Sequence, residues 1–126
     1  MHTEISYTVR LGDIALNSFS ATSLGDAVFH NLAADHRTRL GVRWNMTRRN
    51  DLMGLYRDKT APKGNGAIAL GEICALADQL GITLTLGTSV AKLKLMYEAF
   101  RFTPTHEYSA SPGYCATFYR RPPQSI

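Results

Sequence analysis

A turn, a helix and a strand in the middle of the 126-residue chain constrain its fold more than any other segment. The glycine turn Lys63-Gly64-Asn65-Gly66 precedes residues 67–80, in which apolar side chains recur at helical spacing. Gly81 follows, and glycine is the residue that most often ends a helix in the left-handed conformation. Residues 82–86 then alternate between apolar and polar side chains, as a half-buried strand does. With a short apolar strand expected at 52–56, this order predicts a crossover unit with two parallel strands.

The remaining segments carry weaker signals. Before the crossover unit we expect a strand over 4–9, a turn at 11–13, a strand over 14–19, a helix from its cap at Ser23 to about His36, and a poorly defined stretch over 38–50 in which Leu40, Val42 and Trp44 alternate. After it we expect a helix from a cap at Thr88 or Ser89 to about Phe100, strands over 102–108 and 114–119, and a frayed tail over 120–126.

Length and composition favour a single globular domain over residues 1–126, with 44% hydrophobic and 19% charged residues. No apolar run approaches the ~20 residues that span a bilayer, and the first residues do not resemble a secretory signal, so we expect a cytoplasmic protein without a membrane contact. Cys74 and Cys115 are too few for a disulfide framework and lack metal-ligand spacing. We expect both to be reduced, buried, small apolar residues, and we expect no metal site.

Basic residues are concentrated in the segment 37–63. Eight of the fourteen lysines and arginines lie there: Arg37, Arg39, Arg43, Arg48, Arg49, Arg57, Lys59 and Lys63. Only Asp51 and Asp58 oppose them. Such a field attracts nucleic acid, an acidic partner or a phosphorylated cofactor, although an unevenly charged solvated face has the same composition.

The glycine turn itself is compatible with several ligands. A nucleoside-triphosphate loop is excluded, because Ala67 and Ile68 stand where a lysine and a hydroxyl residue are needed. A dinucleotide fold is disfavoured, because no acidic residue follows Leu86 to hold the ribose. The pyrophosphate of coenzyme A remains, since glycines let the backbone approach a phosphate and the first helical N–H groups point at it. A plain helix-opening turn that binds nothing is the other alternative.

Further motifs follow in a fixed order. Ala61-Pro62-Lys63-Gly64-Asn65-Gly66 is followed by the helix and strand of 73–86, by Tyr97-Glu98-Ala99-Phe100-Arg101-Phe102, and by Thr117-Phe118-Tyr119-Arg120-Arg121-Pro122. From Leu55 to Pro122 this order resembles the GNAT-type N-acetyltransferases, in particular their small phage-encoded branch. Residues 1–60 form a short and divergent front half, and residues 61–122 match the cofactor half.

The resemblance implies an α+β fold with a mixed central sheet, helices on both faces, and two parallel strands that splay apart at an acetyl-CoA site. It assigns contacts with coenzyme A to Lys63, Gly64, Asn65, Gly66, Ala67 and Ser89. An amine of a protein or a small molecule would attack the thioester directly, and Tyr97 would return a proton to the departing thiolate. A phenol suits that role because its pKa near 10 is close to that of an alkyl thiol. Asp58 and Glu72 are both near in sequence, and neither is singled out as the base.

Three departures from the family pattern leave a second function open. Ala61 stands where the loop usually has Gln or Arg, Arg101 stands where a glycine precedes the phenylalanine, and Val90 stands where many members have asparagine. The alternative is a non-catalytic protein of the same fold that binds a host partner through its basic 37–63 segment. Nucleic acid, with Trp44 and Tyr56 as stacking surfaces, is the least favoured partner. A homodimer through an exposed edge strand is also open.

Overall fold

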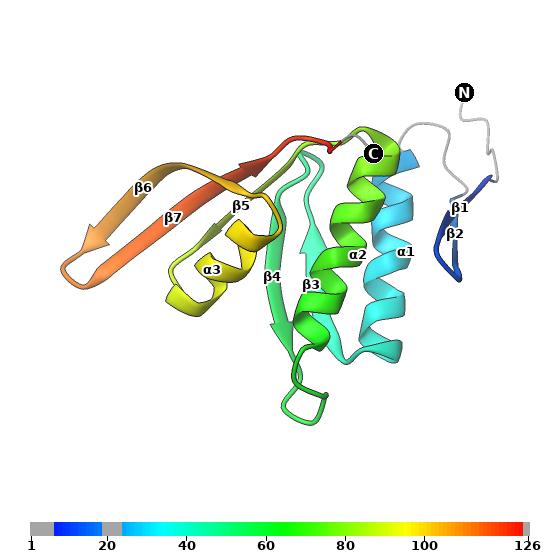
Figure 1. Cartoon of the computed structure of the whole chain (residues 1–126), viewed down its shortest axis with the longest axis horizontal. Coiled ribbons are helices and arrows are strands. Elements are labelled where there is room, and N and C mark those ends of the chain that lie inside the picture. The colour runs from blue at the N-terminus through cyan, green and yellow to red at the C-terminus, as the bar shows by residue number, and fades with distance from the viewer. Residues whose placement is uncertain (1–6, 19–23, 125–126) are drawn as a thin grey trace.

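The computed structural model describes residues 7–18 and 24–124 (Figure 1). Within these ranges the chain forms seven strands and three helices of a mixed α+β class. In chain order they are β1 (Tyr7–Leu11), β2 (Ile14–Ser18), α1 (Leu24–Arg39), β3 (Val42–Met46), β4 (Leu52–Arg57), α2 (Asn65–Leu80), β5 (Leu84–Thr88), α3 (Ala91–Ala99), β6 (Thr103–Ser111) and β7 (Tyr114–Arg121).

All the strand ladders in the described chain are antiparallel. The β1–β2 hairpin stands beside α1, β3 pairs with β4, and a three-stranded sheet has the order β5–β7–β6 (Figure 1). The expected parallel pair across α2 is reduced to one isolated bridge, which joins Asp51 to Thr85 just before β4 begins. The Thr85 N–H donates to the Asn50 carbonyl over 3.1 Å at the same point. The β3–β4 hairpin and the β5–β7–β6 sheet therefore touch at one end only.

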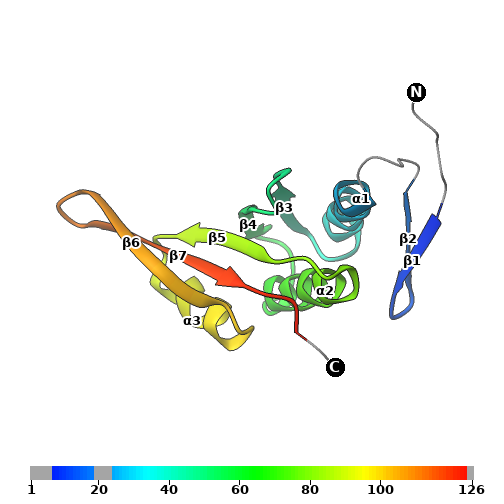
Figure 2. The same ribbon diagram turned by 90° about the horizontal axis from the view of Figure 1, so that it is seen from above.

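The helices cover one side of these strands. On β3, Val42 and Trp44 are buried while Arg43 and Asn45 are exposed. The Trp44 indole is hydrogen-bonded to His36 of α1, so the buried face of β3 is the one that α1 covers. Figure 2 shows α2 and α3 beneath the strands β5 and β7, and no described helix lies on the opposite side. The expected α+β class is confirmed, whereas helices on both faces of the sheet are not seen in the described chain, because α1 packs beside α2 and not across the sheet from it.

Strand β4 contains a bulge. Arg43 pairs with Tyr56 and Asn45 pairs with Met53, so both Gly54 and Leu55 stand opposite Trp44. Gly54 has φ +65°, the left-handed conformation that this kind of bulge requires of its first residue. The extra residue changes the alternation, and Leu52 and Leu55, three positions apart, both point into the core.

The core lies between the strands and the first two helices. Val28, Phe29 and Leu32 of α1 and Leu70, Ile73 and Leu76 of α2 are almost completely buried. The predicted stripe of α2 is confirmed, and so is its end, since Gly81 has φ +67° and its N–H donates to α2 carbonyls. Burial of these side chains supplies the main favourable term, at about 25 cal/mol per Å² of apolar surface.

Several predicted boundaries shift. Helix α1 runs to Arg39, beyond the expected end near His36, and β5 spans Leu84–Thr88 instead of 82–86. The N-cap of α3 is Val90 and not Thr88 or Ser89. The Thr88 hydroxyl instead accepts the Val90 N–H over 3.2 Å in a turn ahead of the helix. The predicted first hairpin is confirmed over 7–18, whereas residues 4–6, Phe19 and the cap at Ser23 lie outside the described residues.

The tail does not begin at Arg120 as expected. Arg121 ends β7 with its side chain buried, and its Nη1 and Nη2 donate to the Asp78 carboxylate over 2.8 and 3.1 Å. Its Nε donates to the Phe100 carbonyl over 2.8 Å. The Gln124 N–H then donates to the same carboxylate over 2.8 Å. These bonds hold the C-terminal segment against α2 and α3 through residue 124.

Candidate functional site

The glycine turn forms the start of α2. Gly64 is the N-cap residue with φ +95°, where a side chain would be strained, and its carbonyl accepts the first helical bond from Ile68 over 3.1 Å. The Asn65 N–H donates to Pro62 over 3.3 Å. Among the described residues, the N–H groups of Gly66 and Ala67 have no protein partner. They are the unsatisfied donors that make a helix start attractive to an anion.

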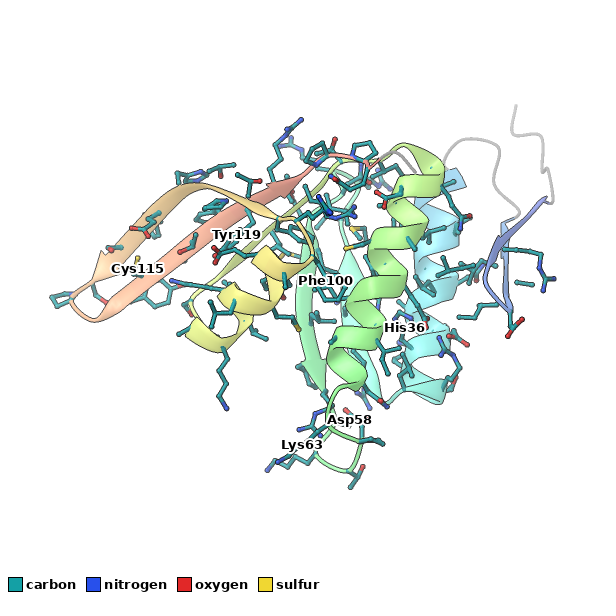
Figure 3. The ribbon with its side chains drawn as sticks, viewed as in Figure 1. His36, Asp58, Lys63, Phe100, Cys115 and Tyr119 are labelled. Carbon is teal, nitrogen blue, oxygen red and sulfur yellow. The ribbon has the colours of Figure 1, made fainter. Side chains whose placement is uncertain are left out.

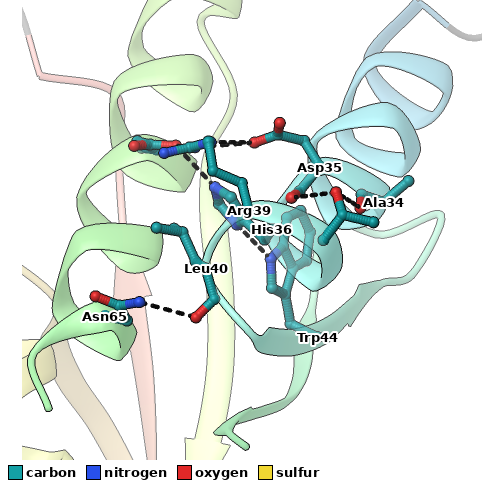
Figure 4. Close-up of polar contacts among 9 residues, drawn as sticks. Ala34, Asp35, His36, Arg39, Leu40, Trp44 and Asn65 are labelled. Carbon is teal, nitrogen blue, oxygen red and sulfur yellow. Dashed lines mark hydrogen bonds and ion pairs between the residues drawn. The ribbon is translucent and has the colours of Figure 1, made fainter. Parts of the chain in front are cut away.

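Contacts with the neighbouring loops fix this turn in place. The Asn65 side chain is used structurally, since its Nδ2 donates to the Leu40 carbonyl over 2.9 Å (Figure 4). Arg57 donates to the Ala61 carbonyl. A Cβ on Gly41 would lie 2.8 Å from the Ala61 Cβ, so the loop packs directly on the α1–β3 turn. Figure 3 places Lys63 and Asp58 together on this loop. Lys63 is exposed and its charge is free to meet a ligand, whereas Asp58 pairs with Arg43 over 3.2 Å.

Tyr97 lies on the buried face of α3. Its ring is 5.6 Å from that of Phe102 and 6.2 Å from that of Tyr119. Burial raises the pKa of its hydroxyl to about 12, so the group keeps its proton at neutral pH. Among the described residues no side chain is hydrogen-bonded to that hydroxyl. Ser89 is exposed in the connection from β5 to α3. The structure thus gathers Lys63 to Ala67 in one turn and places Ser89 and Tyr97 in the following unit, on the β5–α3 connection and on α3.

A buried polar cluster around His36 had no distinct sequence signal. The His36 ring is 0% exposed and lies between two elements (Figure 4). The Trp44 indole N–H donates to its Nδ1 over 2.8 Å, so the proton of the neutral ring is on Nε2, which lies 2.9 Å from Glu72 Oε1. Burial lowers the pKa of His36, against the opposing effect of Glu72. Glu72, one of the two carboxylates considered as a base, is a partner of this cluster and also pairs with Arg39.

This cluster is not arranged to hold a metal ion. Ligand atoms of Asp35, His36 and Glu72 lie within 4.8 Å of one another, which is close enough for one. However, the Arg39 guanidinium forms ion pairs with the carboxylates of both Asp35 and Glu72. Its positive charge already neutralises the two groups that would otherwise bind a metal cation. The His36 Nε2 carries the ring proton and cannot ligate without moving it to Nδ1, where it would oppose the Trp44 N–H. The cluster is therefore a structural clamp between α1, β3 and α2.

A trough lies on the side of the strands that the helices leave open. It has a volume of about 540 Å³ and is bordered by Met53, Gly87, His106, Phe118 and Arg120. At its end the Asp51 carboxylate accepts hydrogen bonds from the hydroxyls of Thr85 and Thr47. His106 pairs with Phe118 across β6 and β7, so Cys115 is not its neighbour and a cysteine–histidine pair is not formed. Cys74 is buried, as predicted, and Cys115 is half-buried.

Comparison with protein-family models, with curated proteins and with solved structures gives no match for this chain. Among the described helices, none combines the length and the apolar character that crossing a membrane requires.

Proposed function

We propose that the chain binds acetyl-CoA and transfers its acetyl group to an amine. The observation that carries the proposal is the start of α2, where Gly64 at φ +95° turns the backbone and the N–H groups of Gly66 and Ala67 have no partner among the described residues. A pyrophosphate accepts such donors and is favoured by the positive end of the helix dipole. Lys63 adds a full positive charge beside them.

The strands on either side of α2 would receive the pantetheine arm. One parallel bridge joins Asp51 to Thr85, and beyond it no further ladder pairs β4 with β5 in the described chain. The bulge at Gly54 and Leu55 bends β4 in this region. Backbone groups left without strand partners can pair with the amides of pantetheine in the manner of an added strand. These features support the splayed arrangement that the resemblance implies.

The proposed reaction needs no covalent enzyme intermediate. The amine nitrogen attacks the thioester carbonyl, and an amide N–H of bulged β4 stabilises the oxyanion. The C–S bond then breaks while the new C–N bond remains, and Tyr97 gives its proton to the thiolate sulfur. The proton of the amine leaves to water. Asp58 is already paired with Arg43, and Glu72 is bonded to His36 and Arg39, which favours water over either carboxylate.

Calorimetric titration with acetyl-CoA tests the cofactor site directly. Wild-type protein should bind with micromolar affinity, and Tyr97→Phe should bind equally well, because the tyrosine acts only on the departing thiolate. No heat of binding at high micromolar acetyl-CoA would refute the proposal. Transfer is then followed by mass increase of a peptide with a free α-amine, where Tyr97→Phe should lower kcat by about 10²-fold.

The non-catalytic alternative makes the opposite prediction. If the protein binds a host partner through residues 37–63, a pull-down should recover that partner in stoichiometric amounts. Tyr97→Phe should not change the amount recovered. Charge reversal at exposed arginines of this segment would abolish it. The two functions are therefore distinguished by one variant, since Tyr97 lies outside the segment.

A further inference from the structure

The open side of the strands carries a pair of stacked rings. The His106 and Phe118 rings have centroids 4.6 Å apart and planes inclined by only 10°. Gly87 makes this position of Phe118 possible, because a Cβ there would lie 2.8 Å from the Phe118 Cε1. His106 is exposed, so the ring face that it turns away from Phe118 is accessible. A flat aromatic ligand can extend such a stack.

Arg120 borders the same trough, and the turn with Arg48 and Arg49 leads into Asp51 at its end. Arg120 lies opposite Thr85 in the β5–β7 ladder, and Thr85 is bridged to Asp51. The turn that carries Arg48 and Arg49 immediately precedes Asp51 and is tied to β5 by the Thr85 N–H. Arg48, Arg49 and Arg120 are all exposed, and none forms an ion pair with another described residue. Exposed guanidinium groups without ion-pair partners among the described residues suit the phosphates of a chain ligand.

We propose that this open face binds single-stranded nucleic acid, with a base stacked on His106 and phosphates on Arg48, Arg49 and Arg120. A duplex fits less well, because its bases are already stacked on one another and cannot reach the ring. The Asp51 carboxylate, which accepts two hydroxyl protons, keeps lone pairs for the amino group of a base. Of the two stacking residues expected from the sequence, Trp44 cannot serve because it is buried beneath α1, whereas Tyr56 is exposed. This binding does not rest on acetyl transfer, and His106, Arg48, Arg49 and Arg120 are not assigned to it, although the trough lies between the strands β4 and β5 that would receive pantetheine.

Fluorescence anisotropy with a labelled oligocytidine of about twelve nucleotides tests the proposal at about 50 mM salt. His106→Ala should weaken binding about tenfold, because one base loses its stacking partner. Arg49→Gln with Arg120→Gln should make the slope of log Kobs against log salt less negative by about 1.4, at about 0.7 per phosphate contact. His106 and both arginines are exposed, so all three changes preserve the fold.

Matched controls lie on the helical side of the molecule. Arg37→Gln with Lys92→Gln removes the same charge from exposed positions of α1 and α3, and Leu95→Ala shortens an exposed side chain of α3. Neither should change the affinity more than twofold. The proposal is overturned if the oligonucleotide does not bind at about 100 µM protein, or if a duplex of the same length binds more tightly than the single strand. It is also overturned if Arg37→Gln with Lys92→Gln weakens binding as much as Arg49→Gln with Arg120→Gln.

Discussion

The indole N–H of Trp44 donates to Nδ1 of His36 over 2.8 Å, and this one bond fixes the protonation state of a histidine with no exposed surface. A second proton on the ring would sit on Nδ1 and face another donor. Burial lowers the pKa of His36 from its ordinary value of 6.5, in agreement with that geometry. The hydrogen bond therefore makes the packing of α1 against β3 dependent on the pH.

The stability of the protein should fall as the pH drops below about 6.5. In that range the unfolded chain takes up a proton at position 36 and the native chain does not, so the free energy of unfolding decreases by up to about 1.4 kcal/mol per pH unit. Urea unfolding followed by fluorescence of Trp44, the single tryptophan, measures this. His36→Gln can make both hydrogen bonds without titrating and should lack this dependence. His30→Gln, at an exposed position, should retain it.

Trp44→Phe should destabilise the fold by about 1–3 kcal/mol. The ring volume is mostly kept, but Nδ1 of His36 loses its donor in a place that water does not reach. Circular dichroism during urea unfolding provides the measurement, since the fluorescent residue is removed. Tyr56→Phe, on the open face of β4, is the control and should change the unfolding free energy by less than about 0.5 kcal/mol. Equal effects of the two substitutions would contradict the role given to the Trp44–His36 bond.

Arg121→Gln should cost about 3 kcal/mol of unfolding free energy. The substitution removes the two guanidinium N–H groups that donate to the Asp78 carboxylate. It also removes the Nε–H group that donates to the Phe100 carbonyl. Arg120→Gln is the matched control, because the neighbouring side chain is exposed on the other face of β7. Chemical denaturation of both variants gives the comparison. A loss below 1 kcal/mol for Arg121→Gln would mean that the C-terminal segment is held by other contacts.

Gly66→Ala should separate stability from cofactor binding. No atom lies within 4 Å of a Cβ at this position, and alanine is favoured over glycine in a helix by about 1 kcal/mol, so the variant should be more stable. If a phosphate lies against the Gly66 N–H, the added methyl should also weaken acetyl-CoA binding at least tenfold in calorimetry. Gly71→Ala, within the same helix, should leave the affinity unchanged. Full affinity in Gly66→Ala would place the cofactor elsewhere.

Tyr97 should ionise only at strongly alkaline pH. Burial raises the pKa of its hydroxyl to about 12, while the unfolded chain ionises near 10. The native chain keeps this proton to a higher pH than the unfolded chain does. Tyr97 therefore lowers the free energy of unfolding as the pH rises above 10. Ultraviolet titration of tyrosinate, taken as the difference between wild type and Tyr97→Phe, should show a midpoint near 12. A midpoint near 10 would show a hydroxyl in contact with water.

Local signals predicted the second half of the chain well. The helical stripe of α2, its glycine end and the alternation after it are all set by neighbours in sequence; α2 ends where expected, and the strand β5 forms two residues later than expected. The first half depends on long-range contacts that no local pattern reveals. His36 is enclosed by α1, β3 and α2, and Glu72 is held by Arg39 and His36; neither arrangement has a local signal in the sequence.

The open face was equally hidden from the sequence. Arg120 is far along the chain from Arg48 and Arg49, and the bridge between Asp51 and Thr85 brings the turn that carries those two arginines to the strand that pairs with Arg120. His106 and Phe118 stack because the register of β6 and β7 places them side by side. The sequence shows the basic segment and offers Trp44 and Tyr56 as stacking surfaces; only Tyr56 is exposed, since an alternating pattern gives no indication of which face the helices will cover. The glycine turn was found from its residues, and its ligand stays a prediction.

The extra residue in β4 also determines how the length of this chain can vary. Deleting the codon for Gly54 would restore an unbroken ladder with β3, but residues on one side of the cut would slide by one position. Because successive side chains of a strand point to opposite faces, either Leu52 or Leu55 would then turn from the core to solvent. A substitution at position 54, even a strained one, keeps both leucines inside. The hairpin should therefore tolerate changes of residue at this point far better than the loss of one.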